Sequence, residues 1–167
     1  LPISGALYAM GFNNGGGLGI GTNDTLPHPT PLLVVASGVS SVSAGFYHTM
    51  YVTTSGALYG MGYNNYGQLG DGTTTNRNTP TLIVASGVAF VYCGYLHTMY
   101  ITTSGALYAM GYNNGGGLGI GTNDTLPHPT PLLVVASGVS SVSAGYSHTM
   151  YITTDRKSTR LNSSHRT

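Results

Sequence analysis

Three histidines recur along the 167-residue chain at intervals of about fifty positions: His48, His97 and His148. Recurring histidines could form a ring of metal ligands, because imidazole nitrogen is a common zinc ligand. A zinc site needs its ligands to converge to about 2 Å from the metal, however, and equivalent positions on neighbouring units need not converge. We therefore expect no metal or other cofactor, and expect each histidine to hydrogen-bond inside its own unit, beside Thr49, Thr98 or Thr149.

The other reactive residue types do not form a catalytic pattern. The glycine-rich run at 15–21 lacks the spacing of a dinucleotide-binding loop, and no lysine follows directly as in a P-loop. The chain has no glutamate, and its aspartates are too widely spaced for paired-carboxylate hydrolysis. The single cysteine, Cys93, excludes an internal disulfide and corresponds to Ala44 and Ala144 about fifty positions away, so we expect a small core residue. These observations predict that the protein is not an enzyme.

Charged residues are few and unevenly placed. Residues 1–154 contain one basic side chain, Arg77, against three aspartates, whereas residues 155–167 are net positive. A protein that binds duplex nucleic acid needs several lysine or arginine side chains, so we expect no nucleic-acid partner. No run of about eighteen apolar residues occurs, so we expect no membrane insertion.

The last residues differ abruptly in composition from the rest. Residues 155–165 read DRKSTRLNSSH and resemble the translation of a sequencing-library adapter, and they begin where another Ser-Gly pair would be due. We therefore expect 155–167 to be a non-native tail and set it aside from fold reasoning. Residues 1–154 are then expected to be an incomplete domain, a fragment of a larger protein.

An internal repeat dominates the remaining chain. Residues 4–54 and 104–154 differ at four positions, and residues 55–103 are a diverged copy that is two residues shorter. A period near fifty residues is typical of propellers, solenoids and arrays. Each repeat holds about four short β-type segments separated by Gly, Pro, Asn and Ser, which is typical of a propeller blade. His28 and His128 lie between prolines, and we expect them to be solvated spacers.

Two motifs recur in all three repeats. Residues 56–72 read GALYGMGYNNYGQLGDG, and residues 94–98 read GYLHT. Both resemble the signature of the regulator-of-chromosome-condensation repeat family, and the resemblance covers residues 4–154. Methionine replaces the tryptophan that is common in this family after the first strand, at Met10, Met61 and Met110. Kelch repeats share the period and a Gly-Gly pair but lack the His-Thr element, so they are the second choice.

The resemblance implies an all-β fold: a partial β-propeller with about three four-stranded blades of a seven-bladed ring. Three repeats cannot close such a ring, and the open blade faces leave apolar surface in water. We therefore expect residues 1–154 alone to be loosely packed, to aggregate or to self-associate.

The expected function is a non-enzymatic repeat scaffold for protein–protein interaction, since binding residues concentrate on loops held by rigid elements. The middle repeat has the most distinctive loop, and its candidate contacts are Tyr66, Asp71, Asn76 and Arg77. The expected partners are an unidentified protein and the remaining blades of the protein's own chain. Two alternatives stay open: guanine-nucleotide exchange on a small GTPase, although no wedge-like insertion interrupts the repeat, and an enzyme with a hub site in further blades. A composition rich in Gly, Ser, Thr, Asn and Tyr favours an extracellular or cell-surface location.

Overall fold

The computed structural model describes residues 5–154, so the adapter-like segment lies outside the described residues. All regular structure in the described part is β-strand, which confirms the all-β prediction. The strands in chain order are β1 (Gly5–Phe12), β2 (Pro27–Ala44), β3 (His48–Thr53), β4 (Leu58–Gly62), β5 (Arg77–Val84), β6 (Val88–Cys93), β7 (His97–Thr102), β8 (Leu107–Tyr112), β9 (Pro127–Val135), β10 (Val139–Ala144) and β11 (Thr149–Thr153).

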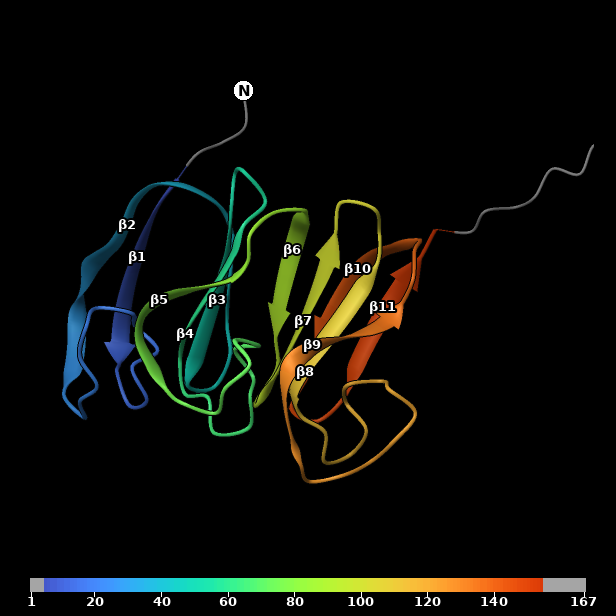
Figure 1. Ribbon diagram of the computed structural model, residues 1–167. Helices are drawn as coiled ribbons and strands as arrows, with labels where there is room; N and C mark the ends of the chain where they lie inside the picture. The colour runs from blue at the N-terminus through green and yellow to red at the C-terminus, as the bar shows by residue number, and fades with distance from the viewer. Residues whose placement is uncertain (1–4, 155–167) are drawn as a thin grey trace, which may run out of the picture.

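These strands form antiparallel sheets that stand side by side (Figure 1). β2 belongs to two ladders, because its first part pairs with β1 and residues 39–44 pair with β3. The first complete blade consists of residues 39–44 with β3, β4 and β5, and the second complete blade consists of β6 to β9. Each end of the described chain carries half a blade. The N-terminal half blade is β1 with residues 27–35 of β2, and the C-terminal half blade is β10 with β11.

The blades are offset from the sequence repeats. β3 closes the first repeat and β4 opens the second, yet the two strands are neighbours in one sheet. Gly56 turns the chain between them with a φ of +80°, and its amide donates to the carbonyl of Thr53 (2.9 Å). Glycine adopts this conformation without steric cost. The Ser-Gly pair at the repeat boundary is therefore a turn inside a blade, and each repeat covalently links two blades.

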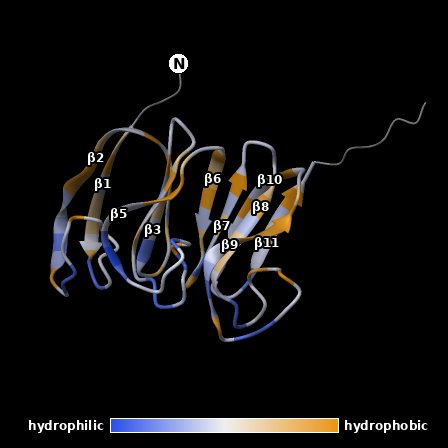
Figure 2. Ribbon diagram, in the orientation of Figure 1, coloured by the Kyte–Doolittle hydropathy of each residue, from blue (hydrophilic) through white to orange (hydrophobic). Residues whose placement is uncertain are grey.

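The hydrophobic core lies between the sheets. Met50 and Leu58 of the first complete blade pack with Val88 and Met110 of the second, and all four side chains are buried. Two further clusters fill the spaces between the complete blades and the half blades. Met61 and Met110 are both buried at the positions where the family commonly has tryptophan. Figure 2 shows apolar residues concentrated on the strands and polar residues in the lower loops.

Candidate partner-binding surface

The long loops and the Gly-x-x-His turns lie at the same end of the blades. The β2–β3 turn spans 45–47 and the β4–β5 loop spans 63–76, and the pairing of His48 with Gly62 places both at one end. The corresponding connections of the second complete blade share this arrangement. Figure 1 shows these connections along the lower edge of the molecule, which we call the loop face.

A buried asparagine organises the β4–β5 loop. The side-chain nitrogen of Asn64 donates to the carbonyls of Thr73 (3.0 Å) and Thr75 (3.1 Å) and to the carboxylate of Asp71 (3.1 Å). Its side-chain oxygen accepts the amide of Leu69 at 2.9 Å. A fully buried amide is stable only when its polar atoms are paired, so this network fixes the loop conformation.

Asn13 and Asn113 occupy the equivalent positions and make similar contacts in their own loops. Sequence reasoning did not assign these asparagines a role. The available signal was their recurrence directly after a Gly-aromatic pair in every repeat.

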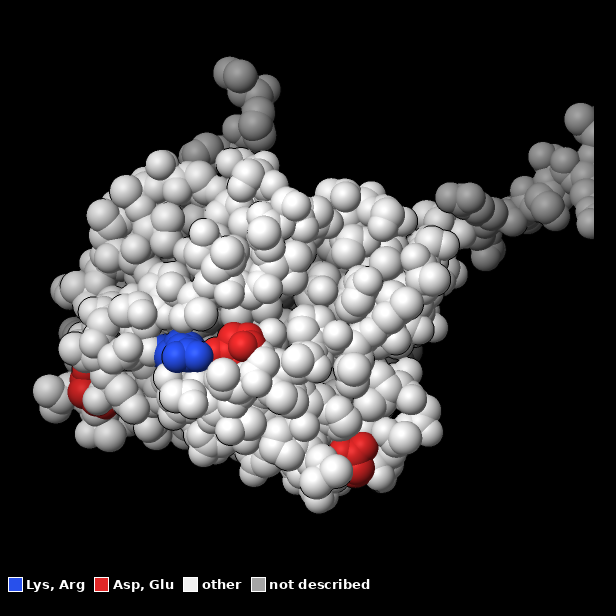
Figure 3. Space-filling model, viewed as in Figure 1, with Lys and Arg blue, Asp and Glu red and all other residues white. Residues whose placement is uncertain are grey.

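Three of the four predicted contact residues make hydrogen bonds that hold the β4–β5 loop, two from inside the loop and one from the first residue of β5. Arg77 donates through Nε and approaches through Nη2 the same carboxylate oxygen of Asp71, at 2.8 and 2.7 Å, and the two side chains are adjacent in Figure 3. The side-chain oxygen of Asn76 accepts a hydrogen bond from the backbone N–H of Asn64 at 2.7 Å. Burial alone would raise the pKa of Asp71, but hydrogen bonds from Thr73 and Arg77 hold that pKa below its usual value. Their contact with a partner stays a prediction.

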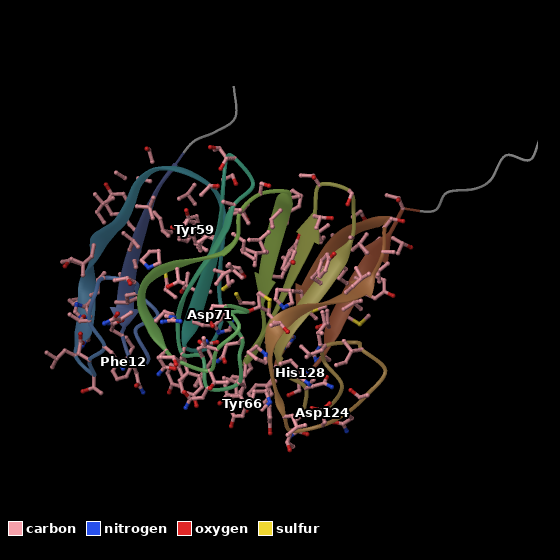
Figure 4. The ribbon with its side chains drawn as sticks, viewed as in Figure 1. Phe12, Tyr59, Tyr66, Asp71, Asp124 and His128 are labelled. Atoms are coloured by element: carbon pink, nitrogen blue, oxygen red, sulfur yellow. The ribbon has the colours of Figure 1, made fainter. Side chains whose placement is uncertain are left out.

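Tyr66, the fourth candidate, belongs to a group of aromatic rings on the loop face (Figure 4). Its ring centroid lies 4.3 Å from that of Tyr112 on the next blade and 6.4 Å from that of Tyr63. Tyr63 in turn lies 6.2 Å from Tyr47. These contacts carry the aromatic surface from one blade to the next.

A second line of rings follows the Gly-x-x-His turns. Phe46, Tyr95 and Tyr146 hold the same position in the three repeats, and successive centroids are 4.5 and 4.0 Å apart. Phe46 also lies 4.1 Å from Tyr47, which joins the two lines. A hydrogen bond with Tyr146 raises the pKa of Tyr95. The joined set, called the aromatic row, consists of Phe46, Tyr47, Tyr63, Tyr66, Tyr95, Tyr112 and Tyr146.

A cavity of about 120 Å³ opens beside the aromatic row. Tyr95, Tyr112 and Tyr146 line it together with the polar side chains of Asn114 and Ser147. Pockets for small-molecule ligands usually measure about 300–1,000 Å³. This cavity is smaller than such a pocket.

The recurring histidines link neighbouring blades. His48 Nε2 lies 3.0 Å from Thr98 Oγ1, and His97 Nε2 lies 3.1 Å from Thr149 Oγ1. The prediction that each histidine bonds inside its own unit is wrong, because each threonine belongs to the following blade. Burial lowers the pKa of His48 to about 3 and that of His97 to about 4, with a smaller contribution from the next histidine.

Within residues 5–154, His, Cys, Asp and Glu side chains form no group of three or more that could hold a metal ion. Cys93 packs against the central cluster, and its Sγ lies 3.3 Å from the carbonyl oxygen of Ser43 on the preceding blade. Burial raises the pKa of the Cys93 thiol to about 12.

The prediction that His28 and His128 are solvated spacers is wrong. Each lies 3.0 Å from the carboxylate of the aspartate four residues earlier, and less than a quarter of either histidine side chain is exposed. Hydrogen bonds, led by that from Thr22, lower the pKa of Asp24 to about 2. Asp124 has its pKa lowered similarly, with Asn113 as the largest contributor.

The visible face is almost free of charge. Figure 3 shows one basic group, adjacent to one acidic group, and two isolated acidic groups near the loops. No helix among residues 5–154 is long and apolar enough to cross a membrane.

Two relatives identified by sequence each match slightly less than half of this chain. The ultraviolet-B receptor UVR8 of Arabidopsis thaliana is 39% identical over 79 residues, which are 46% of this chain and 18% of UVR8. The X-linked retinitis pigmentosa GTPase regulator of Canis lupus familiaris is 40% identical over 72 residues, or 42% of this chain and 7% of that protein. The chain therefore spans less than a fifth of these relatives. The relatives do not support the extracellular or cell-surface location that composition favours.

A solved structure shares the fold. Prp20p from Saccharomyces cerevisiae, described with its binding properties to Gsp1p and histones, has a TM-score of 0.79 at 17% identity. The match covers 90% of this chain and 40% of Prp20p. This likeness confirms the partial β-propeller.

The family described as Regulator of chromosome condensation (RCC1) repeat matches residues 4–52, 55–101 and 104–152. The three matches coincide with the three sequence repeats. Together with the Gly-x-x-His-Thr turns and the propeller fold, they show that this chain belongs to the regulator of chromosome condensation (RCC1) repeat family.

Proposed function

We propose that this chain is a non-enzymatic propeller scaffold whose loop face binds a protein partner through the aromatic row. The observation that carries this proposal is the continuity of seven aromatic rings across neighbouring blades. Phe46 and Tyr146 each contact a neighbouring aromatic ring, yet both side chains remain more than half exposed to solvent. Exposed apolar surface that is contiguous is typical of interaction sites.

The chemistry of the row favours a partner with apolar side chains and accessible backbone groups. Tyrosine offers a rigid apolar ring with a hydroxyl, and for this reason it is common at interface hot spots. Charge contributes little, because Asp71 is already paired with Arg77. We propose Tyr66 as a direct contact, together with the exposed third of Arg77. Asp71 and Asn76 act by holding the loop that presents Tyr66.

A peptide library displayed on phage and selected against the full chain tests this proposal. Replacing Phe46, Tyr95 and Tyr146 together by serine should weaken binding of the selected peptides by about tenfold or more. Phe90→Ser is the matched control, because Phe90 is 50% exposed but lies on β6, outside the row. Binding that survives the triple substitution, or that disappears at high salt, contradicts the proposal.

A second candidate is guanine-nucleotide exchange on a small GTPase. It is supported by the name of one relative, a GTPase regulator, and by the reported binding of Prp20p to Gsp1p. A nucleotide-release assay with a panel of small GTPases tests it. Accelerated release would favour this candidate, and peptide binding without release favours the scaffold. A hydrolase substrate screen tests the remaining alternative, an enzyme site at the hub.

A further inference from the structure

Two tyrosines of neighbouring blades lie face to face on the loop face. Tyr95 lies in the turn between β6 and β7, and Tyr146 lies in the turn between β10 and β11. Their ring centroids are 4.0 Å apart, and the ring planes differ by only 18°. Tyr146 is 66% exposed and Tyr95 is partly exposed. The backbone N–H of Tyr95 donates to the carbonyl of Gly145 at 3.3 Å, which holds the two turns together.

A further blade of the same chain would leave this pair in place. At the preceding junction, which lies between the two complete blades, the ring of Phe46 contacts that of Tyr95 with centroids 4.5 Å apart. Tyr95 therefore contacts one ring from the blade before it and one from the blade after it. A ring from a following blade would contact Tyr146 in the same way, without separating it from Tyr95.

Two of the four differences between the first and third repeats fall at this pair. Phe46 corresponds to Tyr146, so the third repeat has a phenol where the first has a phenyl ring. Tyr47 corresponds to Ser147, which lines the cavity of about 120 Å³ together with Tyr95 and Tyr146. The cavity gives the two phenol rings contact with solvent and space in which to approach one another.

We propose that Tyr95 and Tyr146 form a site of oxidative cross-linking, at which one-electron oxidation driven by hydrogen peroxide joins two neighbouring blades through a dityrosine bond. Each phenol loses one electron and one proton, and the two phenoxyl radicals couple through a carbon–carbon bond between ring positions ortho to the hydroxyls. The hydrogens on the joined carbons then move to the phenol oxygens, which restores both aromatic rings. Hydrogen peroxide accepts the two electrons and two protons and leaves as two molecules of water.

The stacked tyrosine pairs inside the blades are not accessible to such an oxidant. Tyr51 stacks on Tyr59 with centroids 5.2 Å apart, and Tyr100 stacks on Tyr108 at 5.0 Å. Tyr51 is 3% exposed and Tyr100 is 5% exposed. In both pairs the rings are also farther apart than those of Tyr95 and Tyr146.

The remaining close pair on the loop face is less well oriented. Tyr66 and Tyr112 have centroids 4.3 Å apart, but their ring planes are tilted by 44°. A hydrogen bond with Tyr146 raises the pKa of Tyr95, so the hydroxyls of that pair lie together and the ortho carbons beside them are neighbours. The chain has no tryptophan to compete for the oxidant, and its single cysteine, Cys93, packs against the core.

Treatment of the dilute full-length chain with hydrogen peroxide and a haem peroxidase tests the proposal. We expect dityrosine fluorescence in the monomeric fraction, and tandem mass spectrometry of its digest should identify a link between Tyr95 and Tyr146. Tyr146→Phe copies the residue of the first repeat and keeps the ring, so it should fold normally and lose this link. Tyr66→Phe is the matched control, because it also removes one phenol from the loop face and should retain the link.

Urea unfolding then measures what the link does. A bond between two residues about fifty positions apart restricts the unfolded chain as a disulfide does, so oxidation should raise the urea midpoint of the unsubstituted chain. The midpoint of Tyr146→Phe should stay unchanged on oxidation. Dityrosine that forms only between molecules, or mainly between Tyr66 and Tyr112, overturns the proposal. A treated chain without dityrosine, or a link that leaves the midpoint unchanged, also overturns it.

Discussion

His48 donates its Nε2 proton to Thr98 Oγ1 across the gap between the two complete blades, at 3.0 Å. The direction follows from the threonine, whose hydroxyl hydrogen is already donated to the carbonyl of Gln68 at 2.8 Å. The hydroxyl oxygen can then only accept, so His48 is the neutral tautomer protonated at Nε2. Thr98 thus hydrogen-bonds two groups of the preceding blade, the imidazole of His48 and the backbone carbonyl of Gln68.

Replacing Thr98 by valine should destabilise the chain by about 1–3 kcal/mol, because it leaves a buried imidazole donor and a carbonyl without partners. Urea unfolding followed by circular dichroism measures this change. Thr49→Val is the matched control, since Thr49 lies in the same motif but makes no side-chain hydrogen bond to another described residue. Equal destabilisation by the two variants would contradict the importance of the link.

The buried histidines should make stability fall as the pH is lowered. His48 and His97 have folded-state pKa values of about 3 and about 4, below the ordinary 6.5. Between about pH 6.5 and 4 the unfolded chain therefore binds protons that the folded chain does not. The free energy of unfolding should decrease through this window, by at most roughly 2.7 kcal/mol per pH unit for two histidines. Above pH 6.5 these two groups should have little effect.

Urea midpoints at about pH 7.5, 6 and 5 measure this dependence. His48→Gln keeps a hydrogen-bond donor but does not titrate, so it should roughly halve the slope between pH 6 and 5. The aspartates with lowered pKa values contribute only in more acidic solution. An unchanged slope in His48→Gln would assign the pH dependence to other groups.

The repeat and the strands could be predicted from the sequence, but their grouping into blades could not. Ser55 and Gly56 mark the repeat boundary because they recur, and recurrence alone does not say whether a boundary separates blades. Gly56 in fact turns β3 into β4 within one sheet. The wrong partner predicted for His48 has a different cause. Thr49 is the next residue of the same strand, so its side chain faces the opposite side of the sheet, whereas Thr98 of the following blade faces His48.

The candidate surface was only partly visible in the sequence. Tyr66 stood out because its loop differs from those of the other repeats. Phe46, Tyr95 and Tyr146 occur singly at distant positions, and only the stacking of blades brings their rings to about 4 Å of one another. The role of Asn64 was hidden for a related reason, because its partners depend on how the loop closes.

Cys93 should be almost inert toward thiol reagents while the chain is folded. Burial raises its pKa from 9.0 to about 12, so about a thousandfold less thiolate is present near neutral pH, and thiolate is the reactive form. Reaction with a chromogenic disulfide should be very slow in buffer and rapid in concentrated urea. The buffer rate should rise as urea populates open states. Fast labelling of the folded chain would show that the space around Cys93 is open to solvent.

Replacing Gly94 by alanine should destabilise the chain by about 1–3 kcal/mol, through overpacking between blades. A Cβ atom at this position would overlap the imidazole ring of His97 and would lie 2.6 Å from the carbonyl oxygen of Gly145 on the next blade. Backbone cannot yield, so we expect the ring of His97 to be displaced. Gly5→Ala is the matched control, because its added Cβ would meet only ordinary contact at 3.6 Å.

Displacement of the His97 ring should change the pKa of His97, whereas a loss of stability alone should not. Water that reaches the ring of His97 should raise its pKa from about 4 toward the ordinary 6.5, since burial is the main cause of the lowering. Titration of the imidazole resonances by NMR measures this shift in Gly94→Ala and in the Gly5→Ala control. A destabilised Gly94→Ala variant in which His97 still titrates near pH 4 would show that the glycine matters for backbone packing and does not serve to seat the histidine. The Gly-x-x-His spacing would then need another physical reason.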